Sequence, residues 1–462
     1  MLPTRFASRL PRGPRLRRVL RIALRIVLPL VLLWVGLDLY WNAELQHRLR
    51  ALHASGQPLS FAEMMPADIP DSQNAAAQYR QKLPYPSIPY NSATDPGDYY
   101  RNNDRAHELA AGAYLTTPEA QQALAQVERV AAMPQCVWLP RLEEDEHSFL
   151  CGKTRIFVNR AADEAIWLAR HGQPDAALHW CAVGVRLARQ AETYPGTVGL
   201  LVAGADTAIA LRPAQEVIEA HRAGAAARRE LDAALASIDF TQATVTALRG
   251  SIAHLTDLFD DLRAGRKRMR ELMIEELMLP NDDKRGRGGN PIWDLYQSWL
   301  GRPWLNHDEC VYLDLIGPEQ APAVLPSYQG QAAFAAVKVK APPRWLAPIA
   351  NDCLQTRILS RMAVKRDQNG ANLDLCRLTL AFQTYREAQG RYPETLEAVR
   401  AAAPGLRLTD PFSGKSYVYR REGAGFVVYS FGPDMKDDGG KPLQYSQNQD
   451  PPQGDIVWRC AR

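Results

Sequence analysis

The chain of 462 residues is longer than one typical domain, and its hydrophobic content of 46% is enough for a packed core. Its formal net charge of +4 comes from the segment 1–25, which holds eight arginines and no acid. Without those eight, 47 basic residues stand against 51 acidic ones, which argues against a nucleic-acid-binding surface.

The basic N-terminus leads directly into an apolar segment. Residues 26–37 carry no charge, and Arg21 and Arg25 can extend their guanidinium groups toward lipid headgroups. We therefore expect an Arg-rich cytoplasmic tail at residues 1–21 and a transmembrane anchor at 22–41. An aromatic belt would mark the outer end of this anchor, formed by Trp34, Tyr40 and Trp41.

The excess of arginine before the anchor predicts its orientation. Positive residues stay in the cytoplasm, so we expect a single-pass protein of the inner (cytoplasmic) membrane with its bulk in the periplasm or otherwise outside the cytoplasm. A cleaved signal peptide is the alternative, because a basic segment before a short apolar one fits that class too. However, the segment ends in Asp38, Leu39, Tyr40 and Trp41, which offers no small-residue cleavage site.

Composition divides the rest of the chain into four parts. Residues 42–104 are broken by Pro, Asn and Asp and predict an irregular stalk with one short helical candidate at 73–83, and residues 105–278 predict an α-helical body. Residues 279–360 read as a Pro- and Gly-rich linker. Residues 361–462 form a small C-terminal domain, so the expected fold is mainly α with one α+β module.

The strongest helical pattern in the body predicts a helical hairpin. A first helix begins near Thr154 and ends at His171-Gly172, and Pro174 begins a second one. The first helix would bury one face: Ile156, Ala161, Ala165, Ile166 and Ala169. Small residues suit close helix crossings, but no 34-residue period supports a tetratricopeptide array.

Inside the linker, apolar residues recur at helical spacing and predict a short amphipathic helix. They are Ile292, Leu295, Tyr296, Trp299 and Leu300. Such a face packs on the protein's own core, or it contacts the membrane surface or a groove on a partner.

The C-terminal region from Leu373 to Cys460 combines several motifs. A helix ends at Gly390, a YPET turn and a short helix follow, and the DPF turn at Asp410 precedes a strand. A Gly-containing turn then joins this strand to a second one, the acidic stretch SFGPDMKDDGG follows, and the sequence DIVW predicts a closing strand.

In this order, the motifs resemble the C-terminal part of the type II secretion major pseudopilin. The resemblance implies a helix packed on an antiparallel sheet and a calcium-binding last loop. Matched residue by residue, it implies side-chain ligands at Asp434, Asp437 and Asp438 and a carbonyl ligand near Phe431. Calcium favours such oxygen ligands, and three carboxylates so close in sequence repel one another unless a cation offsets their charge. A solvated acidic turn is the alternative.

The chain departs from the pseudopilin pattern at its N-terminus. The anchor lies far upstream of the matched region, and it lacks the Gly cleavage point and the following Glu. We therefore expect neither prepilin processing nor polymerisation.

Two functional classes remain open. The chain contains no GxSxG, HExxH, Walker A or dinucleotide motif, and its acidic cluster at 143–147 and its histidines His171 and His179 form no recognisable catalytic set. We expect a non-catalytic extracytoplasmic scaffold with a protein partner in the cell envelope, possessing a calcium-stabilised module and serving as an accessory of a secretion or pilus-type system. The alternative is an exported hydrolase or cell-wall enzyme with a site assembled from dispersed acids.

Overall fold

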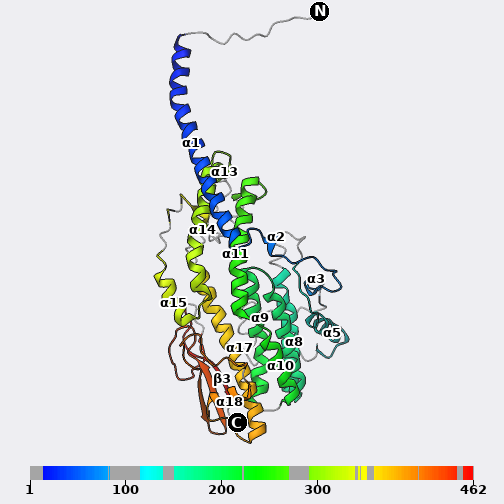
Figure 1. Cartoon of the computed structure of the whole chain (residues 1–462). Helices are drawn as coiled ribbons and strands as arrows, with labels where there is room; N and C mark the ends of the chain where they lie inside the picture. Colours follow the sequence, from blue (N-terminus) through cyan, green and yellow to red (C-terminus); the bar gives the residue numbers. More distant parts are fainter. Residues whose placement is uncertain are drawn as a thin grey trace, which may run out of the picture. The chain divides into compact units, whose positions relative to one another are not determined.

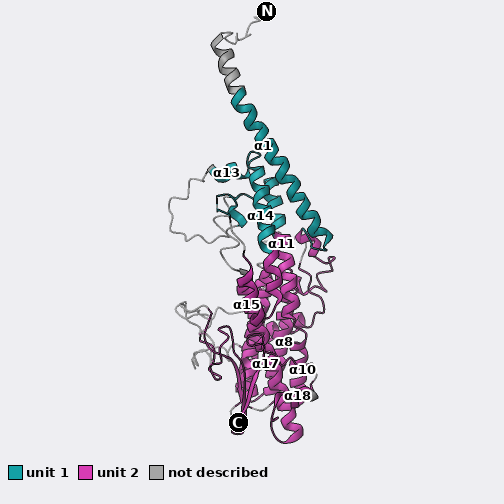
Figure 2. Cartoon of the chain, turned by 60° about the vertical axis from the view of Figure 1, so that its left-hand side comes forward, with its two compact units in different colours: residues 1–59, 255–316, 340–356 teal, residues 60–254, 317–339, 357–462 magenta. Residues whose placement is uncertain are grey.

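The computed structural model describes residues 14–81, 83, 115–138, 150–220, 223–269, 291–338, 342–343, 345–350, 358–403, 405–444 and 451–460 (Figure 1). The chain forms two compact units (Figure 2). Unit 1 comprises residues 1–59, 255–316 and 340–356, and unit 2 comprises residues 60–254, 317–339 and 357–462. Within the described residues the fold is mainly helical, with one three-stranded antiparallel sheet near the C-terminus, as the sequence predicts.

Unit 1 contains the long N-terminal helix α1 (Pro14–Ala54). Over Arg25–Ala54 this helix is long and apolar enough to cross a membrane. A signal sequence near the N-terminus would also be long and apolar enough. Residues 25–33 are all exposed, as expected of side chains that have no protein neighbours.

Helix α1 continues beyond the expected anchor as far as Ala54, into the region that the sequence marks as stalk. This extension is helical because it packs on α14 (Arg302–Val324). Leu45 is buried, and the Arg48 guanidinium donates two hydrogen bonds of 2.9 Å to the Asp314 carboxylate.

A buried carboxylate organises the rest of unit 1. Asp308 on α14 accepts a 2.6 Å hydrogen bond from the hydroxyl of Tyr296, which lies on α13 (Pro291–Gln297). The same carboxylate accepts the backbone N–H groups of Ile349 and Ala350, both at 3.0 Å. The expected short helix near residue 292 is therefore present, and Tyr296 is its buried anchor.

Unit 2 contains the expected hairpin of α7 (Thr154–Arg170) and α8 (Pro174–Glu192). Gly172 joins the helices at φ 74°, and Pro174 occupies the first turn of α8, where a missing N–H is tolerated. The expected buried face of α7 is wrong at Ile156, which is exposed, because the neighbouring Phe157 and Val158 point into the core.

Small residues set the helix crossings of this body. A Cβ on Gly184 of α8 would lie 2.8 Å from Cβ of Ala210 on α9 (Thr197–Glu219), so these two helices approach closely. Further helices are α5 (Pro118–Ala131), α10 (Ala225–Ala236) and α11 (Phe240–Ala264).

Part of the expected stalk packs into unit 2. Two short helices lie there, α2 (Phe61–Met64) and α3 (Ala75–Gln78). The buried Asn74 caps α3 and exchanges hydrogen bonds with the backbone of Val137, and Tyr79 is 1% exposed. This segment is therefore folded, because its Ala-rich run and Tyr79 bury apolar surface.

The C-terminal sheet has the order β1 (Val418–Glu422), β2 (Gly425–Ser430) and β3 (Ile456–Cys460). Every residue of the central strand β2 is buried. The rings of Tyr419 and Phe426 lie 4.7 and 4.9 Å from the ring of Phe382, which lies on α17 (Ile358–Gln389). The short helix α18 (Leu396–Ala402) follows α17.

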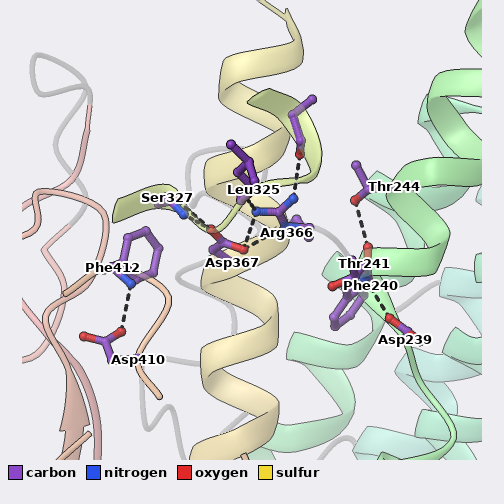
Figure 3. A network of polar contacts seen from close by, with 11 residues as sticks. Asp239, Phe240, Thr241, Thr244, Leu325, Ser327, Arg366, Asp367, Asp410 and Phe412 are labelled. Atoms are coloured by element: carbon purple, nitrogen blue, oxygen red, sulfur yellow. Dashed lines mark hydrogen bonds and ion pairs between the residues drawn. The ribbon is translucent and has the colours of Figure 1, made fainter. Parts of the chain in front are cut away.

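Helix α17 begins at Ile358, about four turns before the apolar pattern that starts at Leu373. Its first turns carry a buried ion pair, Arg366 with Asp367 (Figure 3). Arg366 donates to the carbonyls of Ala323 and Leu325, and Asp367 accepts from the N–H and hydroxyl of Ser327 at the start of α15 (Ser327–Ala336). Charged residues thus occupy core positions here, which conceals the helix from a hydrophobic pattern.

Candidate functional site

The candidate metal ligands lie in the loop between β2 and β3. Tight backbone geometry shapes this loop: Gly439 and Gly440 have φ 74° and 84°, and Met435 has φ 59°. The two ends of the loop approach each other closely, because a Cβ on Gly432 would lie 2.5 Å from the carbonyl oxygen of Gly454.

Two of the expected side-chain ligands lie near a third carboxylate, that of Asp455. Asp455 is fully buried and accepts the N–H groups of Gly440 at 2.7 Å and Asp438 at 3.4 Å. Asp437 accepts the Tyr429 hydroxyl and the Gly439 N–H, both at 3.0 Å. The side-chain oxygen Oδ2 of Asp438 is buried and has no hydrogen-bond partner among the described residues.

The negatively charged carboxylates in this loop repel one another. Burial, together with the carboxylates of Asp437 and Asp438, raises the pKa of Asp455 to about 6, although the hydrogen bonds from the two loop N–H groups lower it in part. A cation in the loop would relieve this repulsion, because it favours the ionised form of every neighbouring carboxylate.

The other two expected ligands are placed differently. Asp434 accepts the N–H of Lys436 at 3.3 Å, within its own turn. Phe431 is half-buried, and its N–H donates to Asp410 at 3.2 Å. Among the described residues, no group of three or more His, Cys, Asp and Glu side chains is arranged to hold a metal ion. The calcium site therefore stays a prediction.

Sequence reasoning did not single out Asp455 as part of this site. It is distant from Asp438 in sequence, and the intervening chain returns to the loop through backbone hydrogen bonds from Asp455 to Lys441 and from Leu443 to Asp455. The signal that was available is its position directly before β3, where its side chain can reach the end of the neighbouring strand.

Asp410 of the DPF turn has a structural role. It is buried, and it accepts the N–H groups of Phe412, Ser413 and Phe431 and the hydroxyl of Ser430 (Figure 3 draws the bond to Phe412). One carboxylate therefore ties the turn before β1 to the end of β2, from which the acidic loop departs.

No protein-family model, curated protein or solved structure matches this chain. The likeness to the pseudopilin therefore depends on its motifs and their order alone.

The two histidines considered for catalysis have structural partners. His171 caps α7, and its Nδ1 lies 2.8 Å from the Trp167 carbonyl oxygen. Each ring nitrogen of His179 faces a different carboxylate, that of Glu230 on α10 at 3.0 Å and that of Glu128 on α5 at 3.1 Å. The acidic cluster at 143–147 lies outside the described residues.

The described cysteines are free thiols. Cys181 is buried in the core of unit 2, and Cys136 and Cys151 are free as well. Burial raises the pKa of the Cys136 thiol to about 12, although a hydrogen bond with Thr193 lowers it, so this thiol is un-ionised at neutral pH.

Proposed function

We propose that this protein is a membrane-anchored, extracytoplasmic, non-catalytic scaffold that binds a protein partner in the cell envelope. Helix α1 would anchor it in the inner membrane with the Arg-rich tail in the cytoplasm, and calcium would stabilise its C-terminal module. The secretion-type resemblance makes an accessory role in a secretion or pilus-type system the most specific form of this proposal.

The observation that carries the proposal is that α17 belongs to the helical body and to the C-terminal sheet at once. On the body side, Arg377 pairs with Asp232 of α10 at 2.7 Å, and Gln383 donates to the carbonyl of Ile218 on α9 at 2.8 Å. On the sheet side, Asn372 accepts the indole N–H of Trp458 at 2.8 Å. The module is thus built into the body, which suits fixed presentation of its loop and does not suit assembly as a free pilin-like subunit.

Three features of the loop support calcium. The carboxylates of Asp437 and Asp438 raise the pKa of Asp455, Oδ2 of Asp438 is buried without a hydrogen bond from the described residues, and all three groups are hard oxygen donors. These three residues would hold the ion after their side chains draw together around it, because without the ion no three of the described acidic side chains are arranged for a metal. Asp434 fits less well, because its carboxylate already closes its own turn.

The test is chemical cross-linking of the full-length protein in native membranes, followed by co-purification in calcium and in chelator. The variant Asp437→Ala/Asp438→Ala removes two ligands, and Glu397→Ala on α18 is the matched control because it removes an exposed carboxylate elsewhere in the module. We expect calcium-dependent recovery of a defined set of envelope proteins with the wild type and the control, and loss of that set with the double variant.

Recovery of the same partners in calcium and in chelator would refute the proposed role of calcium and leave the proposed scaffold function standing. Recovery of no stable partner under either condition would refute the scaffold, and a hydrolase screen of the same preparation would then test the alternative function.

A further inference from the structure

Exposed hydrophobic side chains are concentrated in one unit. Among the described residues, all large exposed hydrophobic side chains lie in unit 1 except Ile156, Leu201 and Tyr328. Many are on α1, where a bilayer would cover them. Of the others in unit 1, Trp345 lies in a separate segment, and the remaining four form what we call the α13 surface: Ile292, Leu295, Trp299 and Leu300.

Helix α13 and the turn after it expose several apolar side chains, although Tyr296 is buried and the charged Asp294 is exposed beside them. Ile292 and Leu295 are 41% and 47% exposed, and Trp299 in the following turn is 68% exposed. The polar Gln297 faces inward instead, where it accepts the N–H of Met269 and donates to the carbonyls of Leu262 and Lys267. Exposed Ile292, Leu295 and Trp299 beside an inward-facing Gln297 are uncommon at a water-facing surface and are typical of one that meets an apolar environment.

The α13 surface directly adjoins the apolar part of α1. The rings of Trp34 and Trp299 meet edge to face at 5.2 Å, and the Trp34 indole N–H donates to the carbonyl of Leu300 at 2.8 Å. A Cβ on Gly301 would lie 2.2 Å from the carbonyl oxygen of Tyr296, so only a glycine fits in this tight corner. The corner places the preceding carbonyl, that of Leu300, against α1.

This hydrogen bond would satisfy both of its polar groups if they lie in lipid. An indole N–H at membrane depth has no water to bind, and irregular backbone is tolerated there only where its polar groups find protein partners. The nearby carboxylate of Asp38 on α1 also has a protein partner, because it pairs with Arg302 at 3.7 Å.

We propose that the α13 surface inserts into the outer leaflet of the bilayer that α1 spans, so that the protein contacts lipid through two elements. The inference rests on the proposed anchoring by α1. With a rise of about 1.5 Å per residue, Trp34 lies about 10 Å inside an anchor that ends at Trp41. That depth is within the outer half of a hydrocarbon core about 30 Å thick. Trp299, in contact with Trp34, lies at the same level.

The test is fluorine NMR of the full-length protein, labelled with fluorotryptophan, in nanodiscs of phosphatidylcholine and phosphatidylglycerol. The variants Trp34→Phe, Trp299→Phe and Trp167→Phe assign three resonances, with Trp167 of α7 as the control in unit 2. One sample contains phosphatidylcholine with a nitroxide near the top of its acyl chain, and another contains a water-soluble gadolinium chelate. Carbonate extraction of native membranes reports anchoring independently.

We expect the lipid nitroxide to remove most of the Trp34 and Trp299 peak heights and to spare Trp167, and the gadolinium chelate to spare Trp34 and Trp299. If gadolinium broadens Trp299 while the lipid probe broadens only Trp34, the inference fails and the anchoring stands. If neither probe reaches Trp299, a protein covers this surface, which also overturns the inference. Release of the protein by carbonate, with Trp34 insensitive to lipid, would refute the anchoring itself.

Discussion

At the scale of single residues, buried carboxylates serve this fold as acceptors for backbone N–H groups. Asp308 does so in unit 1, and Asp367, Asp410 and Asp455 do so in unit 2. Each of them joins segments that are distant in sequence or fixes a turn. Such groups are costly to remove one at a time, because their donors stay behind without partners.

Asp410 is the clearest case for measurement. Asp410→Ala leaves three N–H groups and one hydroxyl without their acceptor, so we expect the free energy of unfolding to fall by about 3 kcal/mol. Urea denaturation of the full-length protein measures it, with Glu397→Ala as a control that changes stability by less than about 0.5 kcal/mol. A loss below about 1 kcal/mol for Asp410→Ala would show that water replaces the carboxylate.

At the scale of elements, close helix approaches depend on glycine. In α11, a Cβ on Gly250 would lie 1.8 Å from the backbone carbonyl oxygen of Pro195, which precedes α9. Gly370 in α17 has no atom within 4 Å of the same position. Both glycines lie in helices of unit 2. Comparing them therefore distinguishes a steric need for glycine from the ordinary helix propensity of alanine over glycine.

Gly250→Ala and Gly370→Ala should therefore have opposite effects. Alanine is favoured over glycine in a helix by up to about 1 kcal/mol, so Gly370→Ala should stabilise unit 2 by roughly 0.5–1 kcal/mol. Gly250→Ala should destabilise it by about 1–3 kcal/mol, because a backbone carbonyl has to move. Thermal unfolding of the two variants measures this, and equal shifts in the same direction would exclude a close approach at Gly250.

At the scale of the whole molecule, unit 2 buries several carboxyl groups, and burial makes their ionised forms less favourable. Burial raises the pKa of Glu164 and Glu192 to about 7 and of Asp206, Asp374 and Asp455 to about 6. In the unfolded chain these groups ionise near pH 4. Between these values the folded state holds protons that the unfolded state releases. Their contribution to stability is therefore fully present in acid and is lost as the pH rises through the folded-state pKa values.

We therefore expect the melting temperature of unit 2, measured by calorimetry in chelator, to rise as the pH falls from about 8 to about 5. Glu230 opposes the trend: burial raises its pKa, but hydrogen bonds from Arg186 and His179 outweigh burial and lower it. Glu164→Gln should reduce the pH dependence and stabilise the protein above about pH 7, because it removes one buried charge. A melting temperature that falls steadily from about pH 8 to about pH 5 would contradict this expectation.

Unit 1 distributes its apolar and charged side chains differently from unit 2. It exposes large apolar side chains along α1 and on the α13 surface and buries others, such as Leu45 and Phe259, in its own core, while Arg263 pairs with Glu309. In unit 2, by contrast, most of the large apolar side chains are buried. This difference is the one expected if lipid covers the apolar part of α1 and the α13 surface.

Local sequence signals determined much of the secondary structure. The apolar run of α1, the Gly172 and Pro174 boundary of the hairpin and the order of the three strands were all readable. These features depend on residues within a few positions of one another, through backbone conformation and capping. The acidic loop was readable too, although not the position of each of its carboxylates.

Only the tertiary structure decided which distant segments join. It placed residues 60–254 and 357–462 in one unit, brought Asp455 beside Asp437 and Asp438, and left several apolar side chains of α13 exposed. A hydrophobic pattern shows that a face is apolar but does not say whether protein or lipid covers it. It also misses the start of α17, because the ion pair of Arg366 and Asp367 occupies core positions and is stabilised by partners that are distant in sequence.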